Sequence, residues 1–556
     1  MTPSEIQAGF SAALQFQFAR NWIEAERGYR ALIATDPGEP VLLYNLGIVL
    51  KAQNRFGEAV DAFDEALSLR SDFPEASNNL GNTLVTCGEL DRAISVLESC
   101  LQLHPTFADG FNSLGSAYKD RGEIHAAVRA LRRAVELQPA NLVFRSNLIY
   151  ALHYDSEATP QSLRAEAEAW AHHCPTLPAT ESHSPAREGH TQNTSQYKAP
   201  STASRRLRIG YISPYFREHC QSLFLAPLLK HHDHARFDVF CYSDDSREDR
   251  ITSQLRGYAE HWRNIANRAA TEIASQIRSD QIDVLIDLGL HTAQNYLPVF
   301  VLRPAPRQIS WLGYPGTTGL SVIDARLTDP FLDPLGEHHE YATERPIRLP
   351  HTFWCYDPSA LSLVAPPPRT PIERDEITFG CLNNFCKVNS GVLASWARVL
   401  AAVPHSRLIL MAPRGSARER VLRELHVAPD RVTFVEFTRR AEYLERYREI
   451  DLCLDTYPYN GHTTSLDALW MGVPLVTRYG DKTVSRAGYS FLANLNLVDL
   501  ATVSDDQFVH SAIALAHDRP RLTSLHATLR ARMENSPLMN APEFARNFEQ
   551  AMVSAQ

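Results

Sequence analysis

Small and large apolar residues recur every 34 residues through the first third of the chain. The segment YNLG ends at Gly47, NNLG at Gly81 and NSLG at Gly115. Three other sets of positions keep the same period: Ala59, Ala93 and Ala127; Phe63, Leu97 and Leu131; Ala66, Cys100 and Ala134. A period of this length predicts stacked pairs of helices, with small residues where two helices approach and large residues filling the neighbouring groove. We count three clear and about two degenerate copies over residues 1–155.

The repeat resembles the tetratricopeptide repeat, a helix-turn-helix unit. Solenoids of this kind usually offer a concave surface to a peptide. On that interpretation Asn45, Asn79 and either Asn112 or Asn147 are candidates to contact a peptide backbone. A spacer that only adds stability is the alternative.

The pattern changes over residues 156–205. The Ala- and Glu-rich run 160–173 predicts a short helix. Residues 174–204 are rich in Ser, Thr, Pro and His and poor in aliphatic residues, which predicts a linker or surface loop.

Short apolar runs then alternate with helical segments in two sets. The first set is 207–213, 237–243, 282–290 and 307–313, and the second is 376–385, 406–413, 431–437, 450–456 and 474–480. This alternation predicts two doubly wound parallel sheets, in an N-terminal Rossmann-like lobe (206–370) and a C-terminal, ligand-binding one (371–556). The proline-rich stretch 365–371 marks their boundary, and the last helix is a candidate to pack back on the first lobe. Two such lobes leave a cleft at the carboxyl ends of their strands.

Composition narrows the class of protein. A chain of 556 residues is too long for one hydrophobic core and is expected to form several domains. The net charge of −9 argues against nucleic acid as the main partner. Nine cysteines without a Cys-x-x-Cys pair indicate reduced thiols and a cytoplasmic setting. The start lacks a signal-peptide pattern, and no apolar run approaches the ~20 residues of a membrane span, so we expect no membrane association.

Several familiar ligand motifs are missing. The sequence has no Gly-x-Gly-x-x-Gly, no Gly-x-x-x-x-Gly-Lys-Ser/Thr, no His-Glu-x-x-His and no Asp-x-Asp. The histidine runs at 231–234 and 338–339 are interpreted as solvated loop residues rather than metal ligands. We therefore expect no metal and no cofactor, so that side chains and helix dipoles would have to neutralise a bound diphosphate.

The segment NGHTTSLDALWMGVP, starting at Asn460, has the form of a loop entering a helix. Thr464 with Asp467 fits a capping box, which satisfies backbone N–H groups at a helix start. A helix start is also an anion site, because of its free N–H groups and positive dipole end. The motif alone leaves both interpretations open.

Five stretches, the last of which contains this segment, carry a family resemblance. They are RIGYISPYFREHC, LRPAPRQISWLGYPGTTG, LPHTFWCYD, FGCLNNFCKVN and DLCLDTYPYNGHTTSLDALWMGVPLVT, following the repeats. Together they resemble the O-linked N-acetylglucosamine transferases over nearly the whole chain. The resemblance implies a two-lobed (GT-B), inverting, metal-independent cytoplasmic enzyme. Such an enzyme would move GlcNAc from UDP-GlcNAc to Ser or Thr of a protein or peptide held along the repeats.

The resemblance also implies roles for residues of the second lobe. His462, Thr463 and Thr464 would meet the UDP diphosphate, Asp467 would meet the ribose, and Lys387 would stabilise charge on departing UDP.

Three positions of the same lobe depart from the family pattern. Asn384 stands where the family has a glutamine near the diphosphate. Arg440 replaces a ribose-contacting lysine. Tyr443 replaces a histidine that lies against uracil in the animal enzymes, and its aromatic ring can still stack there.

In the first lobe the resemblance implies that His219 lies beside the sugar and acceptor, as a candidate general base. Cys220 replaces the residue that most members carry next to it. A loop near the sugar matches Tyr314, Pro315, Gly316 and Thr317, although a tight turn would also explain its glycine. His261 is a weaker candidate for the same pocket.

Two alternatives stay open. One is a related transferase with another UDP-sugar or a non-protein acceptor. The other is a repeat scaffold with reduced catalytic activity, against which the joint retention of the candidate residues speaks.

Overall fold

The computed structural model describes residues 2–175, 205–336, 341–361 and 376–554. Its internal contacts divide the chain into two units. The first comprises Met1–Ala151 with Ala412–Arg423, and the second comprises Leu152–Met411 with Glu424–Gln556. The predicted linker and domain boundary lie largely outside the described residues, as do the histidines at 338–339.

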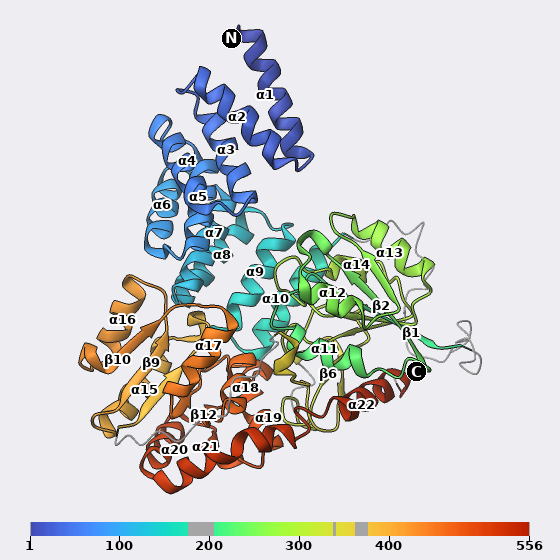
Figure 1. The fold of residues 1–556 in the computed structure, drawn as a ribbon, viewed down its shortest axis with the longest axis vertical. Coiled ribbons are helices and arrows are strands. Elements are labelled where there is room, and N and C mark those ends of the chain that lie inside the picture. Colours follow the sequence, from blue (N-terminus) through green and yellow to red (C-terminus); the bar gives the residue numbers. More distant parts are fainter. Residues whose placement is uncertain (1, 176–204, 337–340, 362–375, 555–556) are drawn as a thin grey trace. The chain divides into compact units, whose positions relative to one another are not determined.

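The first unit is a stack of antiparallel helical hairpins (Figure 1). Its helices are α1 (Pro3–Phe18), α2 (Trp22–Thr35), α3 (Pro40–Ala52), α4 (Phe56–Leu69), α5 (Pro74–Cys87), α6 (Leu90–Leu103), α7 (Ala108–Asp120), α8 (Ile124–Leu137) and α9 (Leu142–Leu152). This confirms the helical repeats predicted from the 34-residue period.

The repeated glycines lie where paired helices come closest. A Cβ atom placed on Gly81 would come within 2.7 Å of Leu97, and one on Gly115 within 2.6 Å of Leu131. Real Cβ atoms do not approach so closely, so each glycine admits the large residue that follows it by 16 positions. The period therefore records one packing contact made again in each repeat.

Residues 412–423 belong to the first unit, although the sequence predicts them in the second lobe. The Asp91 carboxylate accepts hydrogen bonds from the Ser416 backbone N–H at 2.8 Å and hydroxyl at 2.5 Å. Asp91 also pairs with Arg121 at 3.0 Å. These polar contacts tie the segment to the repeats.

The second unit contains two sheets in which every recorded strand pair is parallel. The first-lobe sheet has the order β3-β2-β1-β4-β5-β6-β7. Its strands are β1 (Leu207–Ser213), β2 (Phe237–Ser243), β3 (His261–Asn264), β4 (Val284–Asp287), β5 (Arg307–Ser310), β6 (Ala325–Thr328) and β7 (Arg345–Arg348). Its helices are α11 (Ser222–His231), α12 (Arg250–Arg256), α13 (Ala270–Ser279) and α14 (Leu297–Val301), preceded by α10 (Pro160–His173).

The second-lobe sheet has the order β10-β9-β8-β11-β12-β13. Its strands are β8 (Thr378–Cys381), β9 (Arg407–Met411), β10 (Val432–Val435), β11 (Leu452–Leu454), β12 (Leu475–Arg478) and β13 (Ala501–Thr502). Its helices are α15 (Ser390–Ala402), α17 (Arg440–Arg446), α18 (Thr463–Trp470), α19 (Ala487–Asn494), α20 (Asp505–His517) and α21 (Arg519–Glu534), whereas most of α16 (Ser416–Leu425) belongs to the first unit. The repeat solenoid followed by two doubly wound sheets confirms the predicted fold class.

The last helix, α22 (Ala541–Ser554), lies against α11 of the first lobe (Figure 1). Glu549 at this contact accepts from Nδ1 of His232 at 2.9 Å, and Nε2 of His232 is hydrogen bonded to the Tyr211 hydroxyl at 2.7 Å. His232 is 5% exposed. The interpretation of residues 231–234 as solvated histidines is therefore wrong for His232, because α22 and β1 bury it between hydrogen-bond partners.

Within the described ranges, no helix combines the length and apolar character needed to cross a membrane.

Candidate functional site

The strand order of each sheet reverses direction at one place, and the predicted site residues follow the strands at these places. The first-lobe sheet reverses between β1 and β4, and His219 lies in the loop after β1. The second-lobe sheet reverses between β8 and β11. Lys387 follows β8, and the loop after β11 leads into α18. In open parallel sheets, ligands bind outside the carboxyl ends of the strands at such places.

Lys387 is held against the loop that precedes α18. Its Nζ donates to the carbonyl oxygen of Asn460 at 2.7 Å and lies 4.2 Å from the centroid of the Tyr459 ring. Burial lowers the pKa of Lys387 to about 8, although nearby thiols and Asp455 favour its charged form. Within the described part of the chain, no carboxylate lies within ion-pair distance of this ammonium group. An anion that enters the site would therefore meet an uncompensated cation.

The capping box predicted at Thr464 and Asp467 is wrong. The helix begins at Thr463, with His462 as its N-cap, and it has no side-chain cap. Thr464 instead donates its hydroxyl to Oδ1 of Asn383, a residue that follows β8. Because no side chain covers the first turn, its backbone N–H groups remain available to an anion.

Asp467 is buried and hydrogen bonded to a residue of each lobe. It is 1% exposed and accepts from the Tyr356 hydroxyl at 2.5 Å and from the Arg440 guanidinium at 2.7 and 3.2 Å. Burial opposes the charge of Arg440, but Asp467 and Tyr356 outweigh it, and the pKa of Arg440 is raised. Asp467 thus fixes the side chains that surround the start of α18.

Tyr443 lies one helical turn after Arg440 on α17. Its hydroxyl lies 2.6 Å from that of Tyr447, which donates to the carbonyl oxygen of Thr464 at 2.8 Å. The partly buried Tyr443 ring is thereby linked to the helix start that Thr464 forms.

His462 lies between two aromatic rings. Its ring centroid is 4.9 Å from that of Tyr459 and 5.2 Å from that of Trp354. Burial, followed by the charge of Lys387, holds the pKa of His462 well below its usual value. The imidazole is therefore neutral beside the lysine.

His219 is stacked on Tyr215, with ring centroids 4.2 Å apart. Its Nδ1 accepts from the backbone N–H of Gln221 at 3.3 Å. Burial, followed by the charge of Arg217, lowers the pKa of His219 to about 4. These features favour a neutral imidazole that carries its proton on Nε2. Such a ring donates a hydrogen bond from Nε2 and is a weak base.

Cys220 brings the loop of His219 to the second lobe. Cys220 is exposed, and its thiol lies 3.8 Å from Nδ1 of His219 and is hydrogen bonded to the Thr463 side chain. Partial desolvation by the neighbouring protein atoms raises the pKa of this thiol. The structure therefore brings together His219, Lys387 and the start of α18.

The loop Tyr314–Thr317 also contacts the second lobe. The carbonyl oxygen of Pro315 accepts from the Thr483 hydroxyl at 2.7 Å. Tyr314 is buried, and Thr317 donates to Glu344 at 2.7 Å. The loop is thus anchored on both sides.

Two residues that the sequence predicts at the ligand site, His261 and Asn384, lie outside the cluster described above. His261 lies at the amino end of β3, stacked on Phe240 at 4.0 Å and 3.2 Å from the Asp238 carboxylate. It does not join the loops at the carboxyl edge, so its proposed place in the pocket is not supported. Asn384 is exposed and caps the short 3-10 helix that carries Lys387.

Sequence reasoning missed the residues that organise the second-lobe edge. Asn383 donates to Asp455 at 3.2 Å and to Thr456 at 2.9 Å. Asp455 also accepts from the N–H of Gly461 at 2.7 Å, which shapes the turn before α18. The position of Asp455 directly after β11 is the signal that could have identified it.

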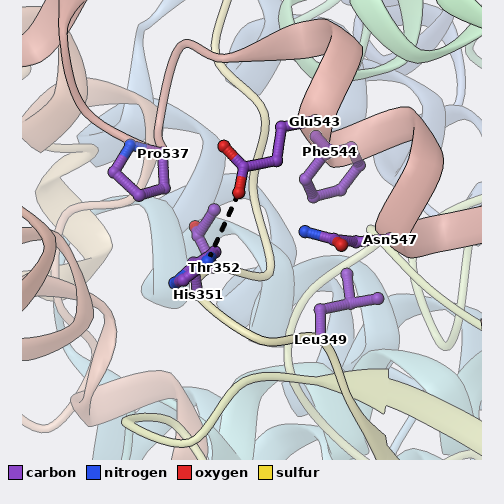
Figure 2. A pocket seen from close by; sticks show the side chains of 7 residues that line it. All are labelled: Leu349, His351, Thr352, Pro537, Glu543, Phe544 and Asn547. Atoms are coloured by element: carbon purple, nitrogen blue, oxygen red, sulfur yellow. Dashed lines mark ion pairs between the residues drawn. The ribbon is translucent and has the colours of Figure 1, made fainter.

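One small cavity lies apart from this cluster. Figure 2 shows it beside α22, with an ion pair of 3.5 Å between His351 and Glu543 across it. Its volume of about 10 Å³ is enough for roughly one water molecule. It contains none of the predicted site residues and is too small to be a substrate site.

Comparisons with known proteins agree with this architecture. Residues 188–365 and 367–548 match glycosyl transferase family 41, and tetratricopeptide repeats match at 12–72, 44–106 and 108–141.

Among curated proteins, a probable UDP-N-acetylglucosamine–peptide N-acetylglucosaminyltransferase SPINDLY from Solanum lycopersicum is 35% identical over 72% of this chain and 43% of its own length. The corresponding SEC protein of Arabidopsis thaliana is 31% identical over 62% of this chain and 37% of its own. The chain spans less than half the length of these relatives.

A solved structure of a Thermobaculum terrenum O-GlcNAc transferase mutant is 29% identical, with a TM-score of 0.76 and full coverage of both chains. The resemblance in fold therefore extends through repeats and lobes alike.

Proposed function

The chain belongs to glycosyl transferase family 41, and from this premise we propose that it transfers GlcNAc from UDP-GlcNAc to Ser or Thr hydroxyls of proteins. The transfer would invert the anomeric centre and need no metal. The observation that carries the proposal is the placement of Lys387 beside the uncapped start of α18, where the sheet order reverses.

In this proposal the donor diphosphate lies on the first turn of α18 and faces Lys387. Backbone N–H groups and a preorganised cation stabilise negative charge that grows as a bond breaks. They would take over the part that a metal ion plays in other diphosphate sites.

The reaction is a single displacement. The acceptor hydroxyl oxygen forms a bond to the anomeric carbon while the bond from that carbon to the diphosphate oxygen breaks. The electron pair of the broken bond stays on UDP, and the hydroxyl proton leaves to a base or to water. Attack from the face opposite to UDP gives inversion.

His219 would orient the acceptor or the sugar through its Nε2–H. Its low pKa and the hydrogen bond at Nδ1 make it a poor general base in this arrangement. A donor placed beside the reacting oxygen still aligns it for attack.

The repeats are proposed to hold the acceptor polypeptide, since the relatives are named as peptide transferases. We also propose a cytoplasmic location. The nine free cysteines support it, because thiols stay reduced in the cytoplasm.

The test is transfer by the purified protein to Ser/Thr peptides, followed by mass spectrometry. UDP-GlcNAc, other UDP-sugars and GDP-linked sugars are supplied separately. We expect a mass increase of one N-acetylhexosamine with UDP-GlcNAc and an inverted anomer by NMR. Transfer from another sugar nucleotide alone, or no transfer despite UDP binding, would contradict the proposal.

A further inference from the structure

A second, larger pocket lies in the second unit, beside the loop Tyr314–Thr317. Its volume is about 40 Å³. It is lined by His153, Pro160 and Leu163 from the segment before and within α10, by first-lobe residues Gly316, Thr317, Arg326, Tyr341 and Ala342, and by second-lobe residues Asp481, Lys482 and Thr483. Three separate parts of the unit therefore build one cavity.

The pocket wall contains a buried ammonium group. Lys482 is 6% exposed, and its Nζ donates to the carbonyl oxygen of Asp155 at 2.6 Å. Within the described residues no carboxylate lies within ion-pair distance of it. Burial lowers the pKa of Lys482 to about 8, against the opposing charges of Asp155 and Asp481. A buried cation with unused N–H groups is costly unless an acceptor completes its shell.

Besides Lys482, the lining contains two nitrogen atoms that have no hydrogen-bond partner among the described residues. They are Nε of Arg326 and Nδ1 of His153, on side chains that are 4% and 5% exposed. The Arg326 guanidinium is paired with Asp333 through its other end, so its Nε–H still needs an acceptor. Buried polar groups in native proteins nearly always find partners.

Size and charge together restrict the ligand. A cavity of this volume holds roughly three water molecules or a group of three to four heavy atoms. The ammonium of Lys482 has N–H groups beyond the one that bonds Asp155, the Nε–H of Arg326 lacks an acceptor, and neutral His153 can donate from Nδ1. We propose that this pocket binds a carboxylate group, supplied by an acidic residue of the acceptor polypeptide or by a small free carboxylic acid.

The pocket adjoins the proposed transfer site. Thr483 in its wall is hydrogen bonded to Pro315 of the loop near the proposed sugar position. The His153 ring lies 4.7 Å from Tyr314 and 6.5 Å from Tyr459, the ring beneath Lys387. A carboxylate held here would position an acceptor beside the donor; this consequence rests on the proposed function, whereas binding itself does not.

Carboxylate binding can be followed directly by NMR at lysine side chains, because the chain contains six lysines and their signals are few enough to assign. Protein labelled with ¹³C at lysine Cε gives one NMR signal per lysine, and the signal of Lys482 is identified by Lys482→Arg. The intact protein is titrated with sodium acetate, with sodium chloride at equal ionic strength as the control. Acetate should move the Lys482 signal saturably and raise the pKa of Lys482 by about 1, as a nearby opposite charge does. UDP, added separately, should move the signal of Lys387.

The two titrations separate the two proposals. If UDP moves Lys387 while acetate affects Lys482 no more than chloride does, the pocket proposal is overturned and the donor site stands. If acetate moves Lys482 while UDP leaves Lys387 unchanged, the pocket proposal stands and the donor site fails.

A second arm identifies the source of the carboxylate. Two pools of randomised Ser peptides, one with Glu and the other with Gln at the acidic positions, compete for transfer. An acceptor carboxylate predicts about tenfold preference for the Glu pool, which corresponds to one charge-assisted hydrogen bond. This preference should vanish in Lys482→Met and persist in Lys230→Met, a matched change of an exposed lysine on α11. Equal use of both pools, with the acetate response intact, assigns the pocket to a small free carboxylate.

Discussion

The two sheet edges that border the candidate site differ in how firmly their side chains are held. At the second-lobe edge, Lys387 is bonded to Asn460, Thr464 to Asn383, and Asp467 to Arg440. Each of these bonds joins segments far apart in the sequence. The cation and the helix start are therefore fixed before any ligand arrives.

At the first-lobe edge, His219 accepts one hydrogen bond of 3.3 Å from its near neighbour Gln221 and stacks on Tyr215. Its imidazole is neutral, and its Nε2 lies 3.9 Å from the Cys220 thiol. In the proposed function, this difference would give charge stabilisation to the second lobe and orientation of neutral hydroxyls to the first. Preorganised charge is usually the larger contribution to catalysis.

The largest expected effect comes from Lys387→Ala. Loss of one preorganised electrostatic contact should lower the transfer rate by about 10²–10³. UDP affinity should fall as well, because the product keeps its charge. Calorimetry with UDP and a transfer assay measure the two effects, with Lys230→Ala as the control. Parent-like UDP affinity in Lys387→Ala would remove the cation from the donor site.

The pH dependence of UDP binding is the next test. Lys387, with its pKa of about 8, is charged below that pH and neutral above it. UDP affinity should therefore begin to fall as the pH rises from 7 to 8 and should approach a fall of about tenfold per pH unit above pH 8, as for one lost proton. Lys387→Arg keeps its charge and should abolish this fall. If the fall persists in Lys387→Arg, another group is responsible.

His219→Ala should have a smaller effect. Loss of one neutral hydrogen bond predicts a turnover about tenfold lower with unchanged UDP affinity. Because the pKa of His219 is about 4, activity should show no acid limb from this residue between pH 5 and 8. A fall of about 10² or more, with an acid limb near pH 6.5, would instead identify a general base.

Tyr356→Phe should have the smallest effect on binding. It removes one of the three hydrogen bonds to Asp467 and leaves both bonds from Arg440. The free energy of unfolding should fall by about 1–3 kcal/mol, measured by denaturant titration, while UDP affinity stays the same. A large loss of UDP affinity would show that Tyr356 contacts the donor directly.

Much of the fold could be predicted because its signals are local. The continuous apolar runs of β1 and β2 are typical of parallel strands covered on both faces. Strand β3, with the sequence HWRN, was missed because an edge strand needs no apolar run. Its position as a strand also explains why His261 lies away from the site.

The details of the site depend on contacts that no local pattern contains. The capping box failed because Thr464 bonds to Asn383, which lies 81 residues earlier. Asn383 and Asn384 are neighbours in the sequence, yet the first is buried at the site and the second is exposed. Composition and spacing cannot distinguish two such residues, because only the packed loop decides which one faces inward.

The central claim is that Lys387 and the start of α18 hold the donor diphosphate without a metal ion. Its most direct test is calorimetric titration of UDP into the protein in excess EDTA and, separately, in excess magnesium or manganese. We predict the same affinity in all three conditions, and its loss in Lys387→Ala in each of them. Binding that disappears in EDTA and returns with the metal would contradict the account.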